Sequence, residues 1–210
     1  MDKIDIIKRI MDDKLVAVVR AESKEQGLKI VDAVQKGGIK LIEVTMTVPG
    51  AVDIIASLSQ AYKGKDVVIG AGTVLDSETA RMCILAGAQF VVSPSFNAGT
   101  STLCNRYRVP YLPGAMTVNE IVECLEHGAD IIKLFPGNLY RPETIKDFKA
   151  PLPQANFMPT GGVSVDNIAQ WVKAGAVAIG VGGSLTAGAK TGDYDAITRE
   201  AQRFIEALTK

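Results

Sequence analysis

Short apolar runs alternate along the whole chain with longer segments in which apolar residues recur every three or four positions. Unbroken apolar runs of about four to eight residues are typical of strands buried in parallel sheets, and the longer periodic segments are typical of amphipathic helices. The apolar runs predict strands at 15–20, 39–46, 67–72, 89–93, 110–114, 130–135, 156–161 and 176–183. The periodic segments predict helices at 2–13, 23–36, 49–62, 76–86, 97–107, 117–127, 142–149, 164–174 and 193–209.

Capping signals support several of these helix boundaries. A serine or threonine before a helix, followed one turn later by a side chain that can reach back, favours a helix start. Three such pairs are Ser23 with Gln26, Thr117 with Glu120, and Ser164 with Asn167. Glycine follows several predicted helices, as at 37–38, 87, 128 and 175, where a left-handed residue commonly ends a helix.

The eight predicted strand–helix units have similar lengths, which indicates parallel strands joined by right-handed crossovers. The regular repeat and the even composition predict an α/β fold, a single-domain (β/α)8 TIM barrel over residues 1–210 with a short N-terminal helix. An open, doubly wound sheet is the alternative fold. In a barrel the loops that follow the strands form the active face. Polar residues and glycines concentrate at those strand ends, so we expect the chemistry there.

A lysine, Lys133, stands in the middle of the apolar run 130–135. An ammonium group in an apolar interior costs several kcal/mol, so burial favours the neutral amine. The neutral amine is the nucleophile of Schiff-base chemistry. The plainer interpretation is that this side chain reaches solvent at a strand end or pairs with Asp130. The run alone leaves both interpretations open.

Glu43 lies in the second predicted strand, where side chains alternate between the two faces. Leu41, Glu43 and Thr45 fall on one face, opposite Ile42 and Val44. We expect the face with Thr45 to be the barrel interior, which would bring Glu43 to Lys133. A lone interior carboxylate would be as costly as a lone interior lysine, so the two groups are also expected to pair for structural reasons.

Paired glycines end the last two predicted strands, at Thr160-Gly161-Gly162 and at Gly182-Gly183-Ser184. Glycine lets backbone N–H groups approach an anion, and a following helix start adds partial positive charge. Many barrels bind phosphate at the loops after strands seven and eight. Two glycine pairs at these adjacent strands therefore predict a phosphate site, although one pair alone would be read as a tight turn.

Composition narrows the classes of function. The chain has 23 basic and 23 acidic residues, and a formal net charge of zero gives no electrostatic reason to bind nucleic acid or a membrane. It has no apolar run long enough to span a bilayer, and residues 1–5 lack the apolar core of a signal peptide. The three cysteines, Cys83, Cys104 and Cys124, lack metal-type spacing, which predicts reduced thiols in a cytoplasmic protein.

His127 is the only histidine, and it stands before Gly128 at a predicted helix end. A favourable interaction with the helix C-terminus is the plainer explanation for it. A Ser-His-Asp triad or a histidine-rich metal centre would have to be built from this one residue. We therefore expect neither a Ser-His-Asp triad nor a histidine-rich metal centre.

The blocks around these residues resemble one family, the 2-keto-3-deoxy-6-phosphogluconate (KDPG) aldolases, also called 4-hydroxy-2-oxoglutarate (KHG) aldolases. They follow the family's order over nearly the whole chain. The matching blocks are VAVVRA at 16–21, IEVT at 42–45, IGAGTV at 69–74, VSP at 92–94, PG at 113–114, IKLFPG at 132–137, PTGGV at 159–163 and GVGGS at 180–184.

The resemblance implies a class I aldolase that needs no metal and no cofactor. Lys133 would form a Schiff base with the C2 carbonyl of the substrate, and Glu43 would carry protons together with a water molecule. Thr73 would help to hold the pyruvyl carboxylate, Phe135 would pack near the substrate, and Arg20 would lie at the same mouth. The glycine loops would hold the phosphate. The predicted substrate-binding residues are Arg20, Thr47, Thr73, Pro94, Phe135, Thr160, Gly161, Gly162, Gly182, Gly183 and Ser184.

Two positions depart from the family pattern. Many members carry an arginine that pairs with the substrate carboxylate two residues after the Glu-Val-Thr block, and this chain has Thr47 there. Asn138 likewise replaces a glutamate that often follows the Phe-Pro-Gly block. The first change leaves open which residue binds the carboxylate, and we expect the second to concern loop packing.

The function implied is the reversible cleavage of KDPG to pyruvate and glyceraldehyde 3-phosphate, or of 4-hydroxy-2-oxoglutarate to pyruvate and glyoxylate, or both. One alternative is an isomerase or decarboxylase that uses Glu43 and Lys133 without a covalent intermediate. Another is a sugar-phosphate-binding protein without catalytic activity. The family resemblance also implies a homotrimer, with a small-molecule 2-keto acid or sugar phosphate as the only other partner.

Overall fold

The predicted alternation of strands and helices is confirmed in the computed structural model, which describes residues 2–208. The strands are β1 (Leu15–Val19), β2 (Leu41–Thr45), β3 (Val68–Gly72), β4 (Val91–Val92), β5 (Tyr111–Leu112), β6 (Gly114–Ala115), β7 (Ile132–Leu134), β8 (Phe157–Pro159) and β9 (Ile179–Val181). The helices are α1 (Lys3–Asp13), α2 (Lys24–Lys36), α3 (Ala51–Ala61), α4 (Ser77–Leu85), α5 (Ala98–Tyr107), α6 (Val118–Glu126), α7 (Thr144–Lys149), α8 (Ile168–Ala174) and α9 (Tyr194–Leu208), with 3-10 turns η1 (Gly137–Leu139) and η2 (Ala187–Thr191). The predicted end of the last helix at 209 lies outside the described residues.

All pairings between these strands are parallel, as the crossover helices require. One sheet has the order β5-β4-β3-β2-β1-β9, and the other has the order β6-β7-β8. Strands β5 and β6 follow one another along the chain with only Pro113 between them. At the other junction of the two sheets, Thr160 forms an isolated parallel bridge with Gly180 of β9. The chain therefore forms one α/β domain around a curled parallel sheet.

Two predicted boundaries differ from the structure for local reasons. The strand predicted at 110–114 is divided at Pro113, because proline has no N–H with which to continue the ladder. The helix predicted to begin at 164 begins at Ile168 instead. The amide of Ser164 donates to Oδ1 of Asn167 at 2.9 Å, so the expected cap forms a turn that delays the helix. The caps predicted at Ser23 and Thr117 are confirmed.

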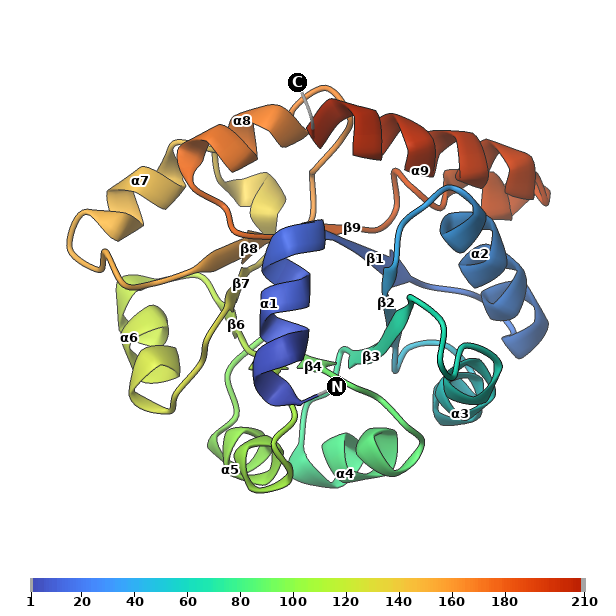
Figure 1. Cartoon of the computed structure of the whole chain (residues 1–210). Helices are drawn as coiled ribbons and strands as arrows, with labels where there is room; N and C mark the ends of the chain where they lie inside the picture. Colours follow the sequence, from blue (N-terminus) through green and yellow to red (C-terminus); the bar gives the residue numbers. More distant parts are fainter. Residues whose placement is uncertain (1, 209–210) are drawn as a thin grey trace.

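Figure 1 shows the strands gathered at the centre of the molecule with helices α2 to α9 around them. In β1 to β5 and in β8, alternate residues enter two separate apolar clusters. Ile42 and Val44 pack outward against the helices, whereas Leu41 packs inward with Val16 and Phe90. The predicted phase of the second strand is thereby confirmed. This inner cluster fills the space that the curled sheet encloses on the side nearer to α1.

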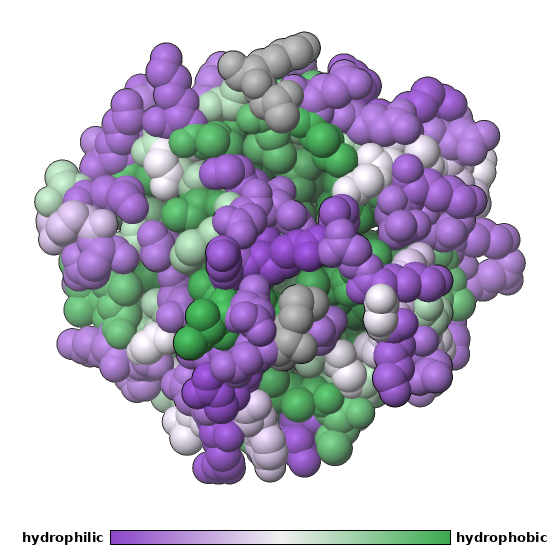
Figure 2. Space-filling model, viewed as in Figure 1, coloured by the Kyte–Doolittle hydropathy of each residue, from purple (hydrophilic) through white to green (hydrophobic). Residues whose placement is uncertain are grey.

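Helix α1 lies across one end of the strands, where it covers the inner cluster (Figure 1). Its two buried residues, Ile6 and Ile10, belong to that cluster, and Asp2 caps its N-terminus in a capping box with Asp5. Figure 2 shows hydrophilic residues over the outer side of the helix in the middle of this face. The amphipathic pattern of residues 2–13 thus produces a helix that closes one end of the sheet and faces water on its other side.

Ion pairs fasten this helix to the neighbouring loops. Arg9 and Lys40 each lie 2.5 Å from a different carboxylate oxygen of Asp66, and their hydrogen bonds lower the pKa of Asp66 to about 2. Lys3 lies 3.0 Å from Asp130. Within residues 2–208, no helix is long and apolar enough to cross a lipid bilayer.

Candidate active site

Lys133 is a buried residue of β7, and its side chain is only 4% exposed. Its Nζ lies 3.8 Å from Oε1 of Glu43 and 5.0 Å from the centre of the Phe135 ring. Its backbone amide donates to the carbonyl of Pro113 at 2.8 Å, which fixes the strand beside its neighbour. Asp130 pairs with Lys3 instead, so the plainer interpretation of a Lys133–Asp130 pair is wrong.

Glu43 is a fully buried residue of β2, as the strand phase predicted. Its separation from Lys133 is longer than a hydrogen bond, for which about 2.7–3.2 Å is usual. Neither carboxylate oxygen has a hydrogen-bond partner among the described residues. Buried carboxylates without such partners are rare and costly. The pair therefore combines charge complementarity with free acceptor positions, an arrangement suited to exchanging protons with a molecule bound beside both groups.

A pocket of about 410 Å³ opens beside this pair. Two of its wall residues connect it to the interior: Val18 is the register neighbour of Glu43, and Phe135 lies against Nζ of Lys133. The rest of the wall consists of Arg20 and the two glycine loops with their neighbours, which are Thr160, Gly161, Gly162, Val163, Ser164, Gly180, Gly182, Gly183 and Ser184. The structure thus brings most of the predicted substrate-binding residues into one cavity.

The glycine loops offer backbone donors to this pocket. Gly161 and Gly162 have φ angles of +95° and +71°, a conformation that L side chains rarely adopt. Among the residues that the structure describes, the amides of Gly162 and Gly183 donate to no protein acceptor. A methyl group at Gly183 would meet no atom within 4 Å, so the space beside it is open. Helix α8 begins only at Ile168, several residues after the glycine loop, so its N-terminus does not follow the loop directly. The free amides of Gly162 and Gly183 are therefore the local donors for an anion.

Arg20 stands at the exposed end of β1 and forms no ion pair within residues 2–208. It lines both the glycine-loop pocket and an adjoining pocket of about 580 Å³ that also contains Glu22 and Lys190. Its guanidinium is therefore a cation at the mouth, next to the loops predicted to bind phosphate.

Thr47 is exposed after β2, and its hydroxyl is already engaged. The hydroxyl of Thr45 donates to the carbonyl of Val19 at 3.1 Å and lies 2.8 Å from the hydroxyl of Thr47. A hydroxyl has a single hydrogen, so Thr47 must be the donor in the contact with Thr45. The outward side of Thr47 then offers only acceptor lone pairs, which do not bind a carboxylate.

Thr73 and Pro94 lie at the ends of β3 and β4 and are not among the residues that line the 410 Å³ pocket. Thr73 has a φ of +57°, which is a strained conformation for a β-branched residue. Such strain clusters at functional sites. The carbonyl of Pro94 lies against Gly114, where a methyl group would come within 2.1 Å of it. The contacts that the resemblance assigns to both residues stay predictions.

Two further residues touch the site without having been predicted to do so. Gly72 lies directly against the carboxylate of Glu43, at a distance that leaves no room for a side chain. Asn138 packs against Gly162, whose added Cβ would come within 2.8 Å of its Cβ. The expectation that Asn138 concerns loop packing therefore has a contact to support it. The sequence placed Gly72 at the end of a predicted strand, 67–72, but did not indicate its contact with Glu43.

The remaining reactive groups lie elsewhere. Burial raises the pKa of Cys83 to about 11 and those of Cys104 and Cys124 to about 12, so these thiols stay protonated near neutral pH. His127 ends α6, with Nδ1 2.9 Å from the carbonyl of Glu123, as the helix-end interpretation predicted. The described residues contain no group of three or more His, Cys, Asp or Glu side chains that could hold a metal ion.

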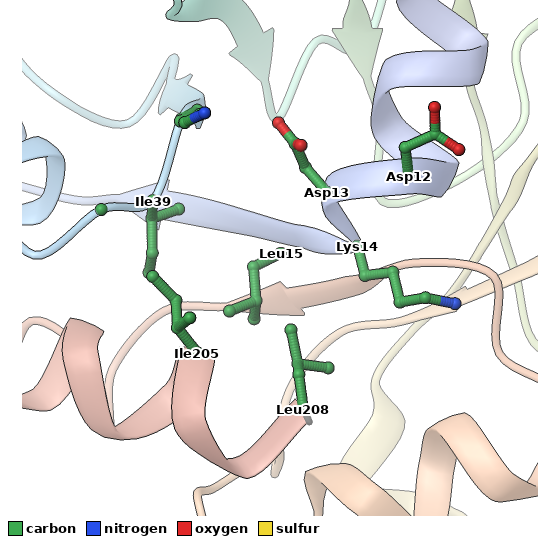
Figure 3. Close-up of a pocket in the computed structure, with 9 residues that line it drawn as sticks. Asp12, Asp13, Lys14, Leu15, Ile39, Ile205 and Leu208 are labelled. Carbon is green, nitrogen blue, oxygen red and sulfur yellow. The ribbon is translucent and has the colours of Figure 1, made fainter. Parts of the chain in front are cut away.

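A pocket of about 310 Å³ lies at the opposite end of the strands (Figure 3). Its floor is apolar, with Leu15, Ile39, Ile205 and Leu208, and acidic and basic side chains such as Asp12, Asp13 and Lys14 stand at its rim. It lies beside the starts of β1 and β2 and contains no buried charged pair. The site with Lys133 and Glu43 is therefore the better candidate for chemistry.

Comparison with known proteins places this geometry in a family. Residues 6–200 match the model of the family described as "KDPG and KHG aldolase". The 2-dehydro-3-deoxy-phosphogluconate aldolase of Treponema pallidum is 34% identical over 98% of this chain and 98% of its own length. The 2-dehydro-3-deoxy-6-phosphogalactonate aldolase of Escherichia coli is 31% identical over 92% of this chain and 93% of its own length.

A solved structure gives the same result. The KDPG aldolase of Legionella pneumophila, with pyruvate captured as a covalent carbinolamine intermediate, has a TM-score of 0.82 and 27% identity, over 90% of this chain and 92% of that one. The matched segment includes the strands that carry Glu43 and Lys133. This chain therefore belongs to the KDPG and KHG aldolase family.

Proposed function

We propose that this chain is a class I aldolase that cleaves KDPG to pyruvate and glyceraldehyde 3-phosphate through a Schiff base at Lys133. The observation that carries the proposal is the buried pair of Lys133 and Glu43, 3.8 Å apart, whose neighbours Val18 and Phe135 line a pocket together with the glycine loops. Relatives named as KDPG aldolases, and one with pyruvate bound as a carbinolamine, support the same reaction.

The first half of the reaction joins the substrate to Lys133. The neutral amine of Lys133 attacks the C2 carbonyl, and the carbonyl oxygen takes up a proton to give a carbinolamine. Loss of the C2 hydroxyl as water then gives a protonated imine. Glu43 is the group that lies close enough to Nζ to give and accept these protons. Burial of both groups strengthens their mutual interaction because water does not screen it.

The second half breaks the carbon–carbon bond. Glu43 removes the proton of the C4 hydroxyl, the C3–C4 bond breaks, and its electron pair flows into the protonated imine. The aldehyde leaves, and an enamine of pyruvate stays on Lys133. Glu43 then returns a proton to C3, and hydrolysis of the imine releases pyruvate and restores the amine. One carboxylate can carry out both proton transfers, because removing the C4 hydroxyl proton leaves it protonated and ready to protonate C3.

The far end of the substrate is a phosphate, and we assign it to the glycine loops. The free amides of Gly162 and Gly183 point to an anion as the ligand, and Arg20 supplies a positive charge next to them. The hydroxyl of Ser184 donates to the carbonyl of Val163 at 3.0 Å, so Ser184 contributes by fixing the two loops together.

The same reasoning favours a closed (β/α)8 barrel as the scaffold. The first and last strands, β1 and β9, are hydrogen-bonded neighbours, whereas the alternative doubly wound sheet leaves its edges open. Pro113 and the Thr160–Gly180 bridge stand at the two junctions between the sheets. Closure at both junctions would give eight strand positions, with β5 and β6 counted as one.

Assembly and location complete the proposal. We propose a homotrimer in the cytoplasm, with contacts on the side of α4. Leu75, Met82 and Leu85 expose 56%, 54% and 69% of their surfaces there. Met82 and Leu85 are one turn apart on the helix and share a face. Burial of such side chains between copies would remove apolar area from water.

A lyase assay tests the substrate assignment. Pyruvate release is measured with KDPG, with its unphosphorylated analogue, with 4-hydroxy-2-oxoglutarate and with 2-keto-3-deoxy-6-phosphogalactonate. The last differs from KDPG in configuration at the carbon whose hydroxyl loses its proton, and a relative is named for it. We expect the highest kcat/KM with a six-carbon phosphorylated substrate. Equal turnover of the unphosphorylated analogue would contradict the phosphate site, and no pyruvate from any substrate would contradict the proposed function.

A further inference from the structure

Gly72, the last residue of β3, is in direct contact with the carboxylate of Glu43. A Cβ atom added to Gly72 would lie 1.9 Å from Oε1 of Glu43 and 2.5 Å from its Cδ and Cγ. Contacts of this length do not occur between atoms that are not bonded, so any side chain at 72 would displace Glu43. The displaced atoms include Cγ, so a small rotation of the carboxylate alone would not relieve the overlap.

The strand register explains why this contact arises. Glu43 is the Cα partner of Gly70, and Thr45 is the partner of Gly72. The Glu43 side chain therefore extends along the sheet toward the active face. Its carboxylate contacts Gly72, two residues beyond its register partner Gly70. The amide of Met46 donates to the carbonyl of Gly72 at 2.8 Å, which fixes the ends of the two strands together. Neither strand can slide to make room.

Backbone conformation does not explain a glycine at this position. Gly72 is not among the residues with positive φ, and the left-handed residue of this corner is Thr73. Glycine inside a strand weakens it, because glycine loses more backbone entropy and packs nothing. The glycine at 72 is therefore explained by the space that its missing side chain leaves for Glu43.

We infer that Gly72 is the positioning residue that allows the Glu43 carboxylate to extend toward Lys133. The inference rests on the proposed function of Glu43 as the proton carrier. A side chain at 72 would turn Glu43 away from the position 3.8 Å from Nζ, while Lys133 on β7 would stay in place. The proton transfers assigned to Glu43 would then be slow, including those that form the Schiff base, but Lys133 would still reach its Schiff base with pyruvate on longer incubation.

The test separates these two steps in wild type, Gly72→Ala and Glu43→Gln. Each protein is incubated with pyruvate until the Schiff base has reached equilibrium, borohydride is then added to reduce it, and the yield of the Lys133 adduct is read by mass spectrometry. In parallel, exchange of the pyruvate methyl hydrogens in D₂O is followed by NMR, because this exchange requires proton transfer at C3. We expect Gly72→Ala to reach the wild-type yield of adduct and to exchange about 10²–10⁴-fold more slowly, as Glu43→Gln does.

Gly70→Ala is the matched control. Gly70 lies on the same face of the same strand, but its added Cβ would meet the ring of Phe90, at 2.4 Å, and not Glu43. We expect this variant to lose stability comparably and to exchange within a few-fold of wild type. Wild-type exchange in a folded Gly72→Ala protein would overturn the inference. An absence of adduct in wild type would instead overturn the proposed function.

Thermal melts keep the inference testable when Gly72→Ala folds poorly. The cost of alanine at 72 is measured with Glu43 present and in a Glu43→Ala background. Contact between the two side chains predicts a clearly smaller loss of Tm in the Glu43→Ala background, because the overlapping atoms are gone. An equal loss of Tm in both backgrounds would show that Gly72 does not act through Glu43.

Discussion

Lys133 has almost no access to water, and its amine is the group that forms Schiff bases. We predict that pyruvate with borohydride attaches irreversibly to the peptide that contains Lys133 and abolishes lyase activity. Chelation by EDTA is expected to leave activity unchanged. Peptide mapping by mass spectrometry checks the site of attachment. Label on another lysine, or inactivation by EDTA that a divalent metal reverses, would contradict the mechanism.

Glu43 is the carboxylate nearest to that amine, and its oxygens have no competing protein donor within the described residues. We predict that Glu43→Gln retains the fold and lowers kcat by about 10²–10⁴, the usual contribution of general acid–base catalysis. Steady-state kinetics and circular dichroism measure both parts. Near-full turnover in a folded variant would leave Glu43 with a structural role only.

Thr47 stands where the family resemblance implies an arginine that would bind the substrate carboxylate. The Thr47 hydroxyl already donates its hydrogen bond to Thr45, so it offers the carboxylate no donor. We predict that Thr47→Arg raises kcat/KM for unphosphorylated substrate, since a charge-assisted hydrogen bond contributes about 1.5–3 kcal/mol. Phosphorylated substrate, anchored at the glycine loops, should gain less.

Arg20 is the competing candidate for that carboxylate. Its place in the glycine-loop pocket favours the phosphate instead, so Arg20→Ala should impair phosphorylated substrate more than unphosphorylated substrate. The measurement is kcat/KM for both substrates in wild type, Thr47→Arg and Arg20→Ala. No gain in Thr47→Arg, together with equal losses for both substrates in Arg20→Ala, would assign the carboxylate to Arg20.

The sequence was sufficient to pair Glu43 with Lys133, because a period of two along β2 and an apolar run around Lys133 fix the faces of both strands. It could not indicate the role of Gly72, since the contact depends on the Glu43 rotamer and on the register with β3. Nor could it show the engaged hydroxyl of Thr47. Both features belong to three-dimensional side-chain placement, which periodicity does not encode.

Among the elements, α1 does a task that is separate from catalysis, because it covers the inner cluster at the end away from the glycine loops (Figure 1). We predict that Ile10→Ala lowers the free energy of unfolding by about 2–5 kcal/mol, the usual cost of truncating a fully buried isoleucine. Denaturant titration measures this cost. The kcat of the folded fraction is expected to stay near that of wild type, and a large fall in kcat would link α1 to the site.

Element boundaries show where sequence signals are ambiguous. Thr117 with Glu120 forms the predicted capping box, whereas Ser164 with Asn167, at the same spacing, forms a turn before α8. Asparagine can accept from a backbone amide in its own turn, and it competes with the helix by doing so. Pro113 was visible in the sequence, but a strand predicted from apolar residues alone passed through it.

At the scale of the whole molecule, the exposed side of α4 is the testable part of the assembly. We predict a species of three times 22.3 kDa in sedimentation equilibrium, which Leu85→Glu dissociates by placing charge in an apolar contact. Ile4→Glu is the matched control, because Ile4 on α1 exposes 67% of its surface and Leu85 exposes 69%. A monomeric wild type, or a trimer that Ile4→Glu dissociates and Leu85→Glu does not, would contradict contacts through α4.

The overall architecture was the most predictable level. Eight strand–helix repeats allow few parallel topologies, because crossovers are right-handed and neighbouring units pack together. The first and last strands, β1 and β9, pair in parallel within the curled sheet. The shortness of the strands near the junctions was not expected, since β4, β5 and β6 have two residues each.

The pairing of β1 with β9 also determines when during synthesis the sheet can be completed. Leu15 is the partner of Ile179, so 164 residues separate them (179 − 15). A ribosome that adds about 5–20 residues per second needs on the order of ten to thirty seconds to make that stretch. Until then the edge of β1 has no neighbour on that side, and contacts so distant in sequence form slowly. Lys133 is synthesised before β9, so the sheet around its amine is complete only after β9 has been made and has paired with β1.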